Sequence, residues 1–306
     1  MGEGLTHFDN GESQASQLKS SKANATLTKT PMYTAINAPR YQRQQLIRDL
    51  EKDTGRTLLC YICGENAEIE RNDTLGVVEL LHNVTPGSSI DLMLHTFGGD
   101  VDAAEKFISM LRAAVPATGT LRVIVPDAAK SAGTLMALGA NEIVMSDTSE
   151  LGTIDPQFVL KDSKGNDMVH SVLNYLDAYE RVATDLRQAP DDPVHKVLIT
   201  GFDPTVLRKF EAVRDRAKTL AENLLKRGGL NYTRIASELM DTRRFPSHSQ
   251  MIGYETAKEI GLNITYMPSE DPIWRRYWDL YCLLRLTVKG NQKLFESALA
   301  SLPLDI

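Results

Sequence analysis

Two turns of small residues divide the middle of the chain, and each stands between an apolar run and an amphipathic one. The run SIDLMLHT has the composition of a buried strand and leads into the turn Phe97–Asp100, after which VDAAEKFISMLRAA places its apolar residues on one helix face. About 32 residues further on, TLRVIVP, DAAKSAGT and LMALGA repeat the order of strand, turn and helix. Strands that alternate with helices at this pitch pair in parallel, which predicts an α/β domain.

The same two turns carry groups suited to acyl transfer. Gly98 and Gly99 precede a helix, where backbone N–H groups have no partner within the helix. Ser131 occupies the equivalent place in the second turn, with the N–H of Ala132 beside it. A glycine pair alone is more often a tight turn, and a serine alone is more often a helix N-cap. Their combination predicts a nucleophile, Ser131, next to an oxyanion hole formed by Gly98 or Gly99 together with Ala132.

Three segments resemble one clan of serine peptidases. LMLHTFGGDVDAAEKFISMLR resembles the strand, glycine turn and helix of Clp-type proteases and of signal peptide peptidase A. VPDAAKSAGTLMALGANEIVMSDTSELGTIDPQ resembles the nucleophile helix and the following strand of that clan, and YETAKEIGLNI resembles the helix that closes its domains. The motifs H-T-x-G-G, S-x-G-T and D-P-Q are most similar to those of the soluble branch named serine dehydrogenase proteinase, and the likeness covers roughly residues 56–265.

This resemblance implies both a fold and an activity. The fold is a ClpP/crotonase-like spiral of β-β-α units with extra C-terminal helices, and the activity is a serine peptidase in which Ser131 attacks the peptide carbonyl. In Clp-type proteases a His follows the nucleophile along the chain and an Asp follows the His. Here Asp155 lies at or next to the position of that His, and His248 lies near the position of that Asp, so the usual order is absent.

The general base has two candidates. AKTLAENLL resembles the helix that carries a lysine base in the stomatin-operon peptidases, with Lys218 in place, and this favours a Ser–Lys dyad. Helix periodicity alone would instead place Lys218 on a solvated face with Glu222 at i,i+4. His248 is the main alternative, because Ser131, His248 and Asp155 would reproduce the roles of a catalytic triad in another chain order. Lys130 adjoins the nucleophile and is expected to point elsewhere.

Composition narrows the remaining possibilities. A hydrophobic content of 42%, 24% charged residues and a formal charge of −6 are typical of a globular protein and argue against a general nucleic-acid binder. No run of about 18 apolar residues is present, so no membrane span is predicted, and a cytoplasmic location is the simplest interpretation. Cys60 and Cys63 lie in an apolar run that reads as a buried strand, and no second pair completes a zinc site. Neither a metal nor a cofactor is predicted.

The chain divides into three expected parts. Residues 1–30 are predicted to be a flexible polar arm, residues 31–268 the peptidase domain, and residues 269–306 a C-terminal helical extension. IWRRYWDLYCLLRL in that extension carries an aromatic stripe at helical spacing, which indicates core or, by preference, a subunit interface. A homo-oligomer is expected, since the resembled families assemble into rings or dimers.

Three functions therefore compete. The leading prediction is a serine endopeptidase that acts on extended peptides or unfolded proteins. The alternatives are an inactive scaffold or regulatory subunit of the same fold, and a crotonase-type acyl-CoA enzyme. The placement of Ser131 argues against the crotonase chemistry, and the absence of a G-x-G-x-x-G turn after a strand argues against a dehydrogenase.

Overall fold

A computed structural model of the chain describes residues 29–161, 164–226 and 231–305. Most of the predicted N-terminal arm therefore lies outside the described residues. The chain divides into two units, one ending at Tyr41 and the other beginning at Gln42. Helix α2 (Pro31–Thr54) runs from the first unit into the second.

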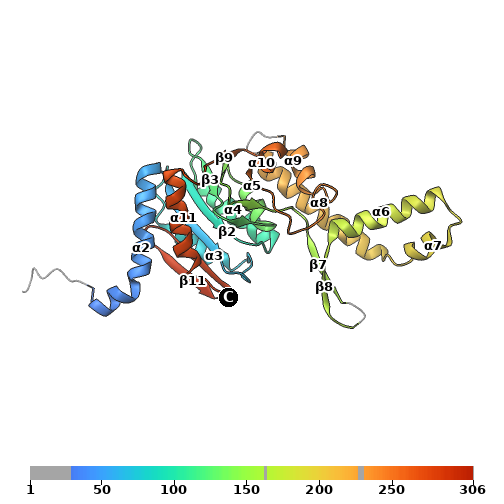
Figure 1. The fold of residues 1–306 in the computed structure, drawn as a ribbon, viewed down its shortest axis with the longest axis horizontal. Coiled ribbons are helices and arrows are strands. Elements are labelled where there is room, and N and C mark those ends of the chain that lie inside the picture. The colour runs from blue at the N-terminus through green and yellow to red at the C-terminus, as the bar shows by residue number, and fades with distance from the viewer. Residues whose placement is uncertain (1–28, 162–163, 227–230, 306) are drawn as a thin grey trace, which may run out of the picture. The chain divides into compact units, whose positions relative to one another are not determined.

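A seven-stranded sheet forms the centre of the second unit (Figure 1). Its strands follow the order β11-β10-β1-β2-β3-β5-β9. β1, β2, β3, β5 and β9 pair in parallel, whereas β10 is antiparallel to β1 and β11 is antiparallel to β10. The strands are β1 (Thr57–Cys63), β2 (Ile90–His95), β3 (Leu121–Ile124), β5 (Glu142–Met145), β9 (Ile264–Tyr266), β10 (Gln292–Glu296) and β11 (Ser301–Asp305).

A second row of short backbone pairings follows the ends of the central strands. Ile69 pairs with Gly99, and Thr96 pairs with Ala129. β4 (Ala128–Ala129) then pairs with β6 (Glu150–Leu151), and Leu151 pairs with Ile252. Three successive units thus consist of a strand of the main sheet, a short strand of the second row and a helix: α3 (Asp73–His82), α4 (Val101–Ala114) and α5 (Ala132–Leu138). This is the predicted spiral of β-β-α units.

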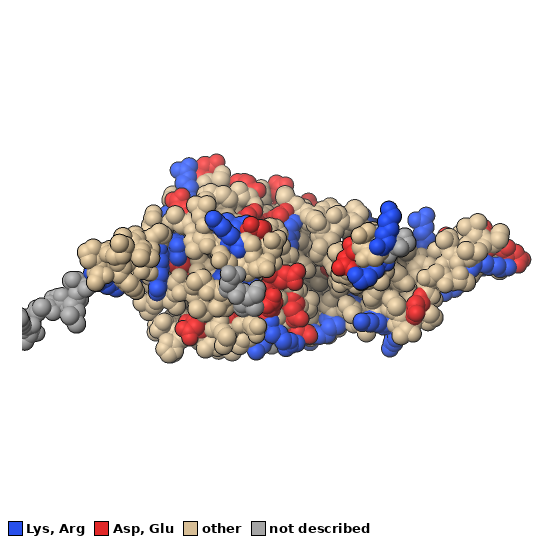
Figure 2. Space-filling model, turned by 90° about the horizontal axis from the view of Figure 1, so that it is seen from below, with Lys and Arg blue, Asp and Glu red and all other residues tan. Residues whose placement is uncertain are grey.

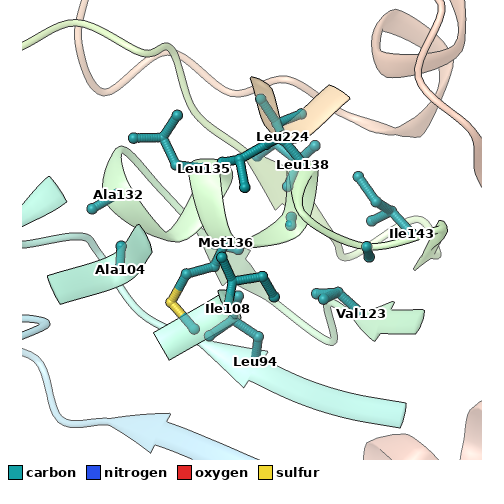
Figure 3. Close-up of a cluster of buried hydrophobic side chains, with 14 of the residues drawn as sticks. Leu94, Ala104, Ile108, Val123, Ala132, Leu135, Met136, Leu138, Ile143 and Leu224 are labelled. Carbon is teal, nitrogen blue, oxygen red and sulfur yellow. The ribbon is translucent and has the colours of Figure 1, made fainter. Parts of the chain in front are cut away.

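Two apolar layers cover the main sheet. One face packs against α3, α4 and α5, together with residues of α8 (Pro204–Lys226), α9 (Tyr232–Leu239) and α10 (Tyr254–Ile260). In Figure 3, Leu135 and Leu138 lie on the side of α5 that faces Leu224, while Met136 points toward Ile108 and Leu94. The helix that follows the candidate nucleophile is therefore held between the sheet and α8.

The other face of the sheet packs against α11 (Pro272–Arg285) and the second half of α2. Most of the stripe that the sequence shows in this helix is buried there, namely Trp274, Tyr277, Tyr281 and Leu284. Core packing accounts for this stripe within one chain, and a C-terminal subunit interface stays a prediction. Residues 292–296 and 301–305 form strands of the main sheet, whereas the sequence predicted a helical extension.

An excursion separates β6 from α9. It comprises the hairpin β7 (Gln157–Lys161) and β8 (Asp167–Ser171), then α6 (Val172–Gln188), α7 (Pro193–Ile199) and α8. The turn between β7 and β8 lies partly outside the described residues. Phe158, Leu176, Leu207 and Phe210 form a small separate core for this excursion. Helix α7, which begins at Pro193, is short and is capped by Asp192.

Cys60 and Cys63 are both buried in β1, as predicted, and both are free thiols. Because successive residues of a strand face opposite sides, Cys60 packs in the α11 layer and Cys63 in the α4 layer. Burial raises the pKa of Cys63 to about 11. The pair therefore shares no site, and none of the described residues forms a cluster of three or more His, Cys, Asp or Glu able to hold a metal ion.

We expect Trp274→Ala to lower the free energy of unfolding by about 3–5 kcal/mol, because it empties the largest side chain from a closed core. Trp278→Ala is the matched control, since Trp278 lies on the same helix but is only partly buried. Urea unfolding followed by circular dichroism measures both losses. Equal losses for the two variants would contradict this account of α11.

His95 gives the fold a pH dependence. Burial lowers its pKa from an ordinary value of 6.5 to about 4, although Asp127 opposes that shift. The unfolded chain therefore binds a proton at His95 below about pH 6.5 while the folded protein does not, so stability is full above that pH and falls by about 3 kcal/mol toward pH 4. Urea unfolding from pH 7.5 to 4 should show a shallower loss for His95→Gln. A loss of the same slope in both proteins would exclude His95 as its source.

Candidate active site

Ser131 has a strained backbone. Its φ of 50° and ψ of −117° make it the one non-glycine residue with positive φ in the described part of the chain. Such a conformation is costly for a residue with a Cβ atom and persists only where its surroundings enforce it. Here the Gly133 N–H donates to the Lys130 carbonyl at 2.7 Å, and the Thr134 hydroxyl donates to the Ala129 carbonyl at 2.8 Å. The Ser131 side chain makes no capping hydrogen bond and is partly exposed.

The glycine turn lies directly against Ser131. Gly98 and Gly99 have φ values of 126° and 140°. A Cβ atom on Gly98 would lie 2.8 Å from the Ser131 Cβ and 3.3 Å from its Oγ, and one on Gly99 would lie 2.3 Å from the Ile69 nitrogen. Only glycine fits either position, for space as well as for conformation. The structure thus brings together the two turns that the sequence singled out.

The backbone amides of the two turns differ in their partners. The Gly98 N–H donates to the Thr96 hydroxyl at 3.1 Å. The Gly98 carbonyl accepts from the Ile69 N–H, and the Asp100 N–H donates to the Ile69 carbonyl, both at 2.8 Å. Within the described residues, the N–H groups of Gly99 and Ala132 have no hydrogen-bond partner. These two amides are therefore available to a ligand beside Ser131.

Two further segments border the turn at Ser131. A Cβ atom on Gly152 would lie 3.2 Å from the Ser131 nitrogen, so the strand end at residues 150–152 packs against the turn. Leu151 and Ile252 exchange backbone hydrogen bonds at 2.9 and 3.0 Å, which brings residues 248–252 alongside. Asp155 and His248 follow and precede this pairing by a few residues each.

Asp155 and His248 lie next to each other. The Asp155 Oδ2 is 3.7 Å from the His248 Nδ1, and Asp155 also accepts hydrogen bonds from the Ser171 hydroxyl and the Gln157 amide, both at 2.8 Å. Asp155 is buried, and His248 is partly buried with its Nδ1 enclosed. The structure therefore places a fixed carboxylate behind one nitrogen of the imidazole. The supporting roles of Ser171 and Gln157 were not predicted, because Ser171 is distant in sequence and Gln157 was noted only as part of the D-P-Q motif.

Neither Lys218 nor Lys130 is paired with a carboxylate in the way that His248 is placed beside Asp155, because Lys218 has no ion pair in the described chain and Lys130 binds Glu150. Lys218 lies on α8 beside Ala217 and Ala221, which pack in the layer around α5, and its own side chain is partly buried. No hydrogen bond or ion pair joins Lys218 to another residue of the described chain, so the alternative pairing with Glu222 is not formed. Lys130 is buried. Its Nζ lies 2.8 Å from the Glu150 carboxylate and 3.4 Å from each of three backbone carbonyls, so the side chain points away from Ser131, as expected.

His95 ends β2, just before the glycine turn, and contacts residues on both sides of it. Its Nδ1 lies 3.2 Å from the hydroxyl of Tyr281, which donates to Asp127 at 2.6 Å, and its ring meets Phe97 edge-on. This contact of the turn with α11 was not predicted, because 186 positions separate the two residues.

Surface charge is mixed. Figure 2 shows Lys and Arg side chains interspersed with Asp and Glu on one face, separated by uncharged surface. Each helix in the described part of the chain is too short or too polar to cross a bilayer.

Comparison with known proteins places this geometry in a family. The model of the family described as ClpP-like SDH-type serine proteinase matches residues 39–270. Two uncharacterized proteins of Methanocaldococcus jannaschii are similar. MJ0137 is 28% identical over 77% of this chain and 80% of its own length. MJ1495 is 29% identical over 38% of this chain and 42% of its own length.

Two solved structures show a partial likeness to this chain. A serine-to-alanine mutant of the 1510-N membrane-bound stomatin-specific protease is similar with a TM-score of 0.42 and 15% identity, over 77% of this chain and 89% of that one. A ClpP1 mutant from Listeria monocytogenes is similar with a TM-score of 0.36 and 14% identity, over 76% of this chain and 99% of that one.

The family match covers most of the chain and agrees with the predicted α/β fold and with the spiral of β-β-α units. The chain belongs to the family of ClpP-like SDH-type serine proteinases.

Proposed function

We propose that this protein cleaves peptide bonds with Ser131 as nucleophile, His248 as general base oriented by Asp155, and the amides of Gly99 and Ala132 as oxyanion hole. The observation that carries the proposal is the strained Ser131 turn packed against Gly98, where two N–H groups and one hydroxyl have no partner among the described residues. Strain of this kind at a polar residue is characteristic of functional sites. It adds to the family assignment, which supplies the serine-peptidase class.

The chemistry follows from those roles. The Ser131 Oγ attacks the peptide carbonyl carbon while its proton passes to the Nε2 of His248, and Asp155 stabilises the imidazolium that forms. The carbonyl oxygen becomes an oxyanion, which accepts hydrogen bonds from Gly99 and Ala132. Collapse breaks the C–N bond, and His248 returns the proton to the leaving amine. Water then attacks the acyl-enzyme by the same route and restores the Ser131 hydroxyl. The 3.7 Å separation of Asp155 and His248 suits a resting site that tightens with substrate.

The glycine turn also suggests the form of the substrate. Ile69 occupies one edge of the turn through Gly98 and Asp100. The N–H and carbonyl of Gly99 face the opposite edge, and neither has a partner among the described residues. An extended peptide can lie along that edge, with its scissile carbonyl at the Gly99 N–H and an amide further along donating to the Gly99 carbonyl. This favours unfolded or extended peptides, consistent with an endopeptidase.

Lys218 is the competing base, and the Ser–Lys dyad that the resemblance favoured stays a prediction. Its position on α8, which packs on α5, keeps it in the region of the nucleophile. His248 is preferred because a buried carboxylate already lies 3.7 Å from its Nδ1, whereas Lys218 has no polar contact within the described chain. The homo-oligomer and the cytoplasmic location also stay predictions, and light scattering of the purified protein measures the first.

A fluorophosphonate probe tests the proposal. We expect it to label Ser131, and we expect His248→Ala to slow both labelling and peptide cleavage by about 10²–10⁴-fold, the usual contribution of a general base. His195→Ala is the matched control, because His195 is also partly buried beside two carboxylates but lies on α7. Tandem mass spectrometry identifies the labelled residue, and a quenched fluorescent peptide measures cleavage.

Three other outcomes have distinct meanings. Loss of labelling in Lys218→Ala, with His248→Ala active, would replace His248 by Lys218 as base. Cleavage that survives Ser131→Ala would exclude the nucleophile. An unlabelled, inactive wild type would favour the scaffold function in place of the peptidase.

A further inference from the structure

A fully enclosed ion pair lies behind the glycine turn. The Lys293 Nζ on β10 is 2.9 Å from the Asp73 Oδ1 at the start of α3, and the two side chains are 1% and 2% exposed. Lys293 is also 3.8 Å from the Glu70 carboxylate. The hydroxyl of Tyr61 donates to the Asp73 Oδ2 at 2.7 Å. Burial raises the pKa of Tyr61, which keeps it a phenol and a donor.

This ion pair is connected to the candidate oxyanion hole by backbone hydrogen bonds. The Asp73 Oδ2 accepts from the Glu70 N–H at 2.9 Å. Glu70 follows Ile69, whose N–H and carbonyl bind the Gly98 carbonyl and the Asp100 N–H at 2.8 Å. Gly99 lies between these two bonds, with no room for even a Cβ atom against Ile69. The direction of the Gly99 N–H therefore depends on the position of Ile69, which in turn depends on Asp73.

Stability alone does not require charges at this place. Removing two charges from water is costly, and replacing a buried ion pair by apolar residues of similar volume is often neutral or stabilising. A carboxylate offers what an apolar residue cannot, because it accepts from Lys293, Tyr61 and the Glu70 N–H at once and so fixes their directions. The three donors to Asp73 therefore fix the position of the backbone next to Ile69.

We propose that Asp73 and Lys293 are positioning residues for catalysis, which hold Ile69 in place and thereby aim the Gly99 N–H at the oxyanion. This inference rests on the proposed function of Ser131 and Gly99. Lys293 stands on a strand beyond residue 270, where the family match ends, so the C-terminal hairpin of β10 and β11 contributes to the site through this lysine.

The test separates positioning from stability. The double variant Asp73→Leu with Lys293→Met removes both charges together and keeps the cluster filled, so it should fold, with stability lowered only by the Tyr61 hydroxyl that loses its acceptor. It also leaves the Glu70 N–H without its acceptor. We expect kcat for a quenched peptide to fall about 10–100-fold, because a misplacement of about 1 Å at a reacting group can cost 10²-fold, with KM changed far less. The rate of Ser131 labelling by the fluorophosphonate should fall in parallel.

Arg43→Met provides the control. Arg43 and Glu296 form another buried ion pair at 2.9 Å, with side chains 5% and 0% exposed, which joins α2 to the same strand β10 without reaching residues 69–73. This variant should lose stability in urea but keep the wild-type kcat. The single variant Asp73→Asn, which has one acceptor oxygen fewer, should lower kcat with the fold intact by circular dichroism.

A double variant that folds and retains the wild-type kcat would overturn the positioning role while leaving the peptidase proposal standing. A fall in kcat of the same size in Arg43→Met would also overturn it, since any loosening of β10 would then suffice. An inactive wild type would overturn the proposed function and this inference together.

Discussion

The backbone pairing between turns that follow successive strands is the constraint on which the candidate site depends. Ile69 binds the glycine turn, Thr96 pairs with Ala129, and Leu151 pairs with Ile252, each through bonds of 2.8–3.0 Å. A positive φ at Ser131 costs free energy that an isolated turn could not supply. In this row each turn is fixed by its neighbours on both sides. The strained serine is a consequence of this pairing, and so are the two amides that have no partner in the described part of the chain.

Buried carboxylates lie at both ends of the parallel strands, Asp91 near the start of β2 and Asp73 beside the row that follows the strand ends. A sheet covered on both faces leaves little water inside, so each carboxylate there needs several donors. Asp91 accepts from Arg56, Arg122 and Tyr277 on the α11 side. Asp73 accepts from a lysine, a phenol and an amide on the α3 side. The apolar layers provide cohesion, and these charged groups fix direction, which matters most where a backbone N–H must face a developing charge.

Local features of this protein could be predicted from the sequence, whereas most distant pairings could not; the proximity of Asp155 and His248, suggested by the triad roles, is an exception. The positions of the glycine turn, of the turn at Ser131 and of the helices that follow them were predicted, because small residues and apolar periodicity act within a few positions, whereas the catalytic role of Ser131 stays a prediction. Lys293 and Asp73 are 220 positions apart, and nothing in either segment indicates the other. The final strands were missed because β10 is short and follows a strong helical pattern in α11. The sequence of β1 is apolar throughout, and it does not indicate whether a second strand pairs with β1 on the side away from β2.

The choice between the two bases turns on what surrounds each group. A lysine must lose its proton before it can act, which requires burial away from water next to the nucleophile. Lys218 is only partly buried, on a helix whose alanines pack close to α5. An imidazole needs no such burial, but it does need a group that selects one orientation and stabilises its charged form. Asp155, buried and held by Ser171 and Gln157, is positioned to do this for His248. The excursion after β6 supplies both supports, so it contributes to the site even though it lies outside the repeated β-β-α units.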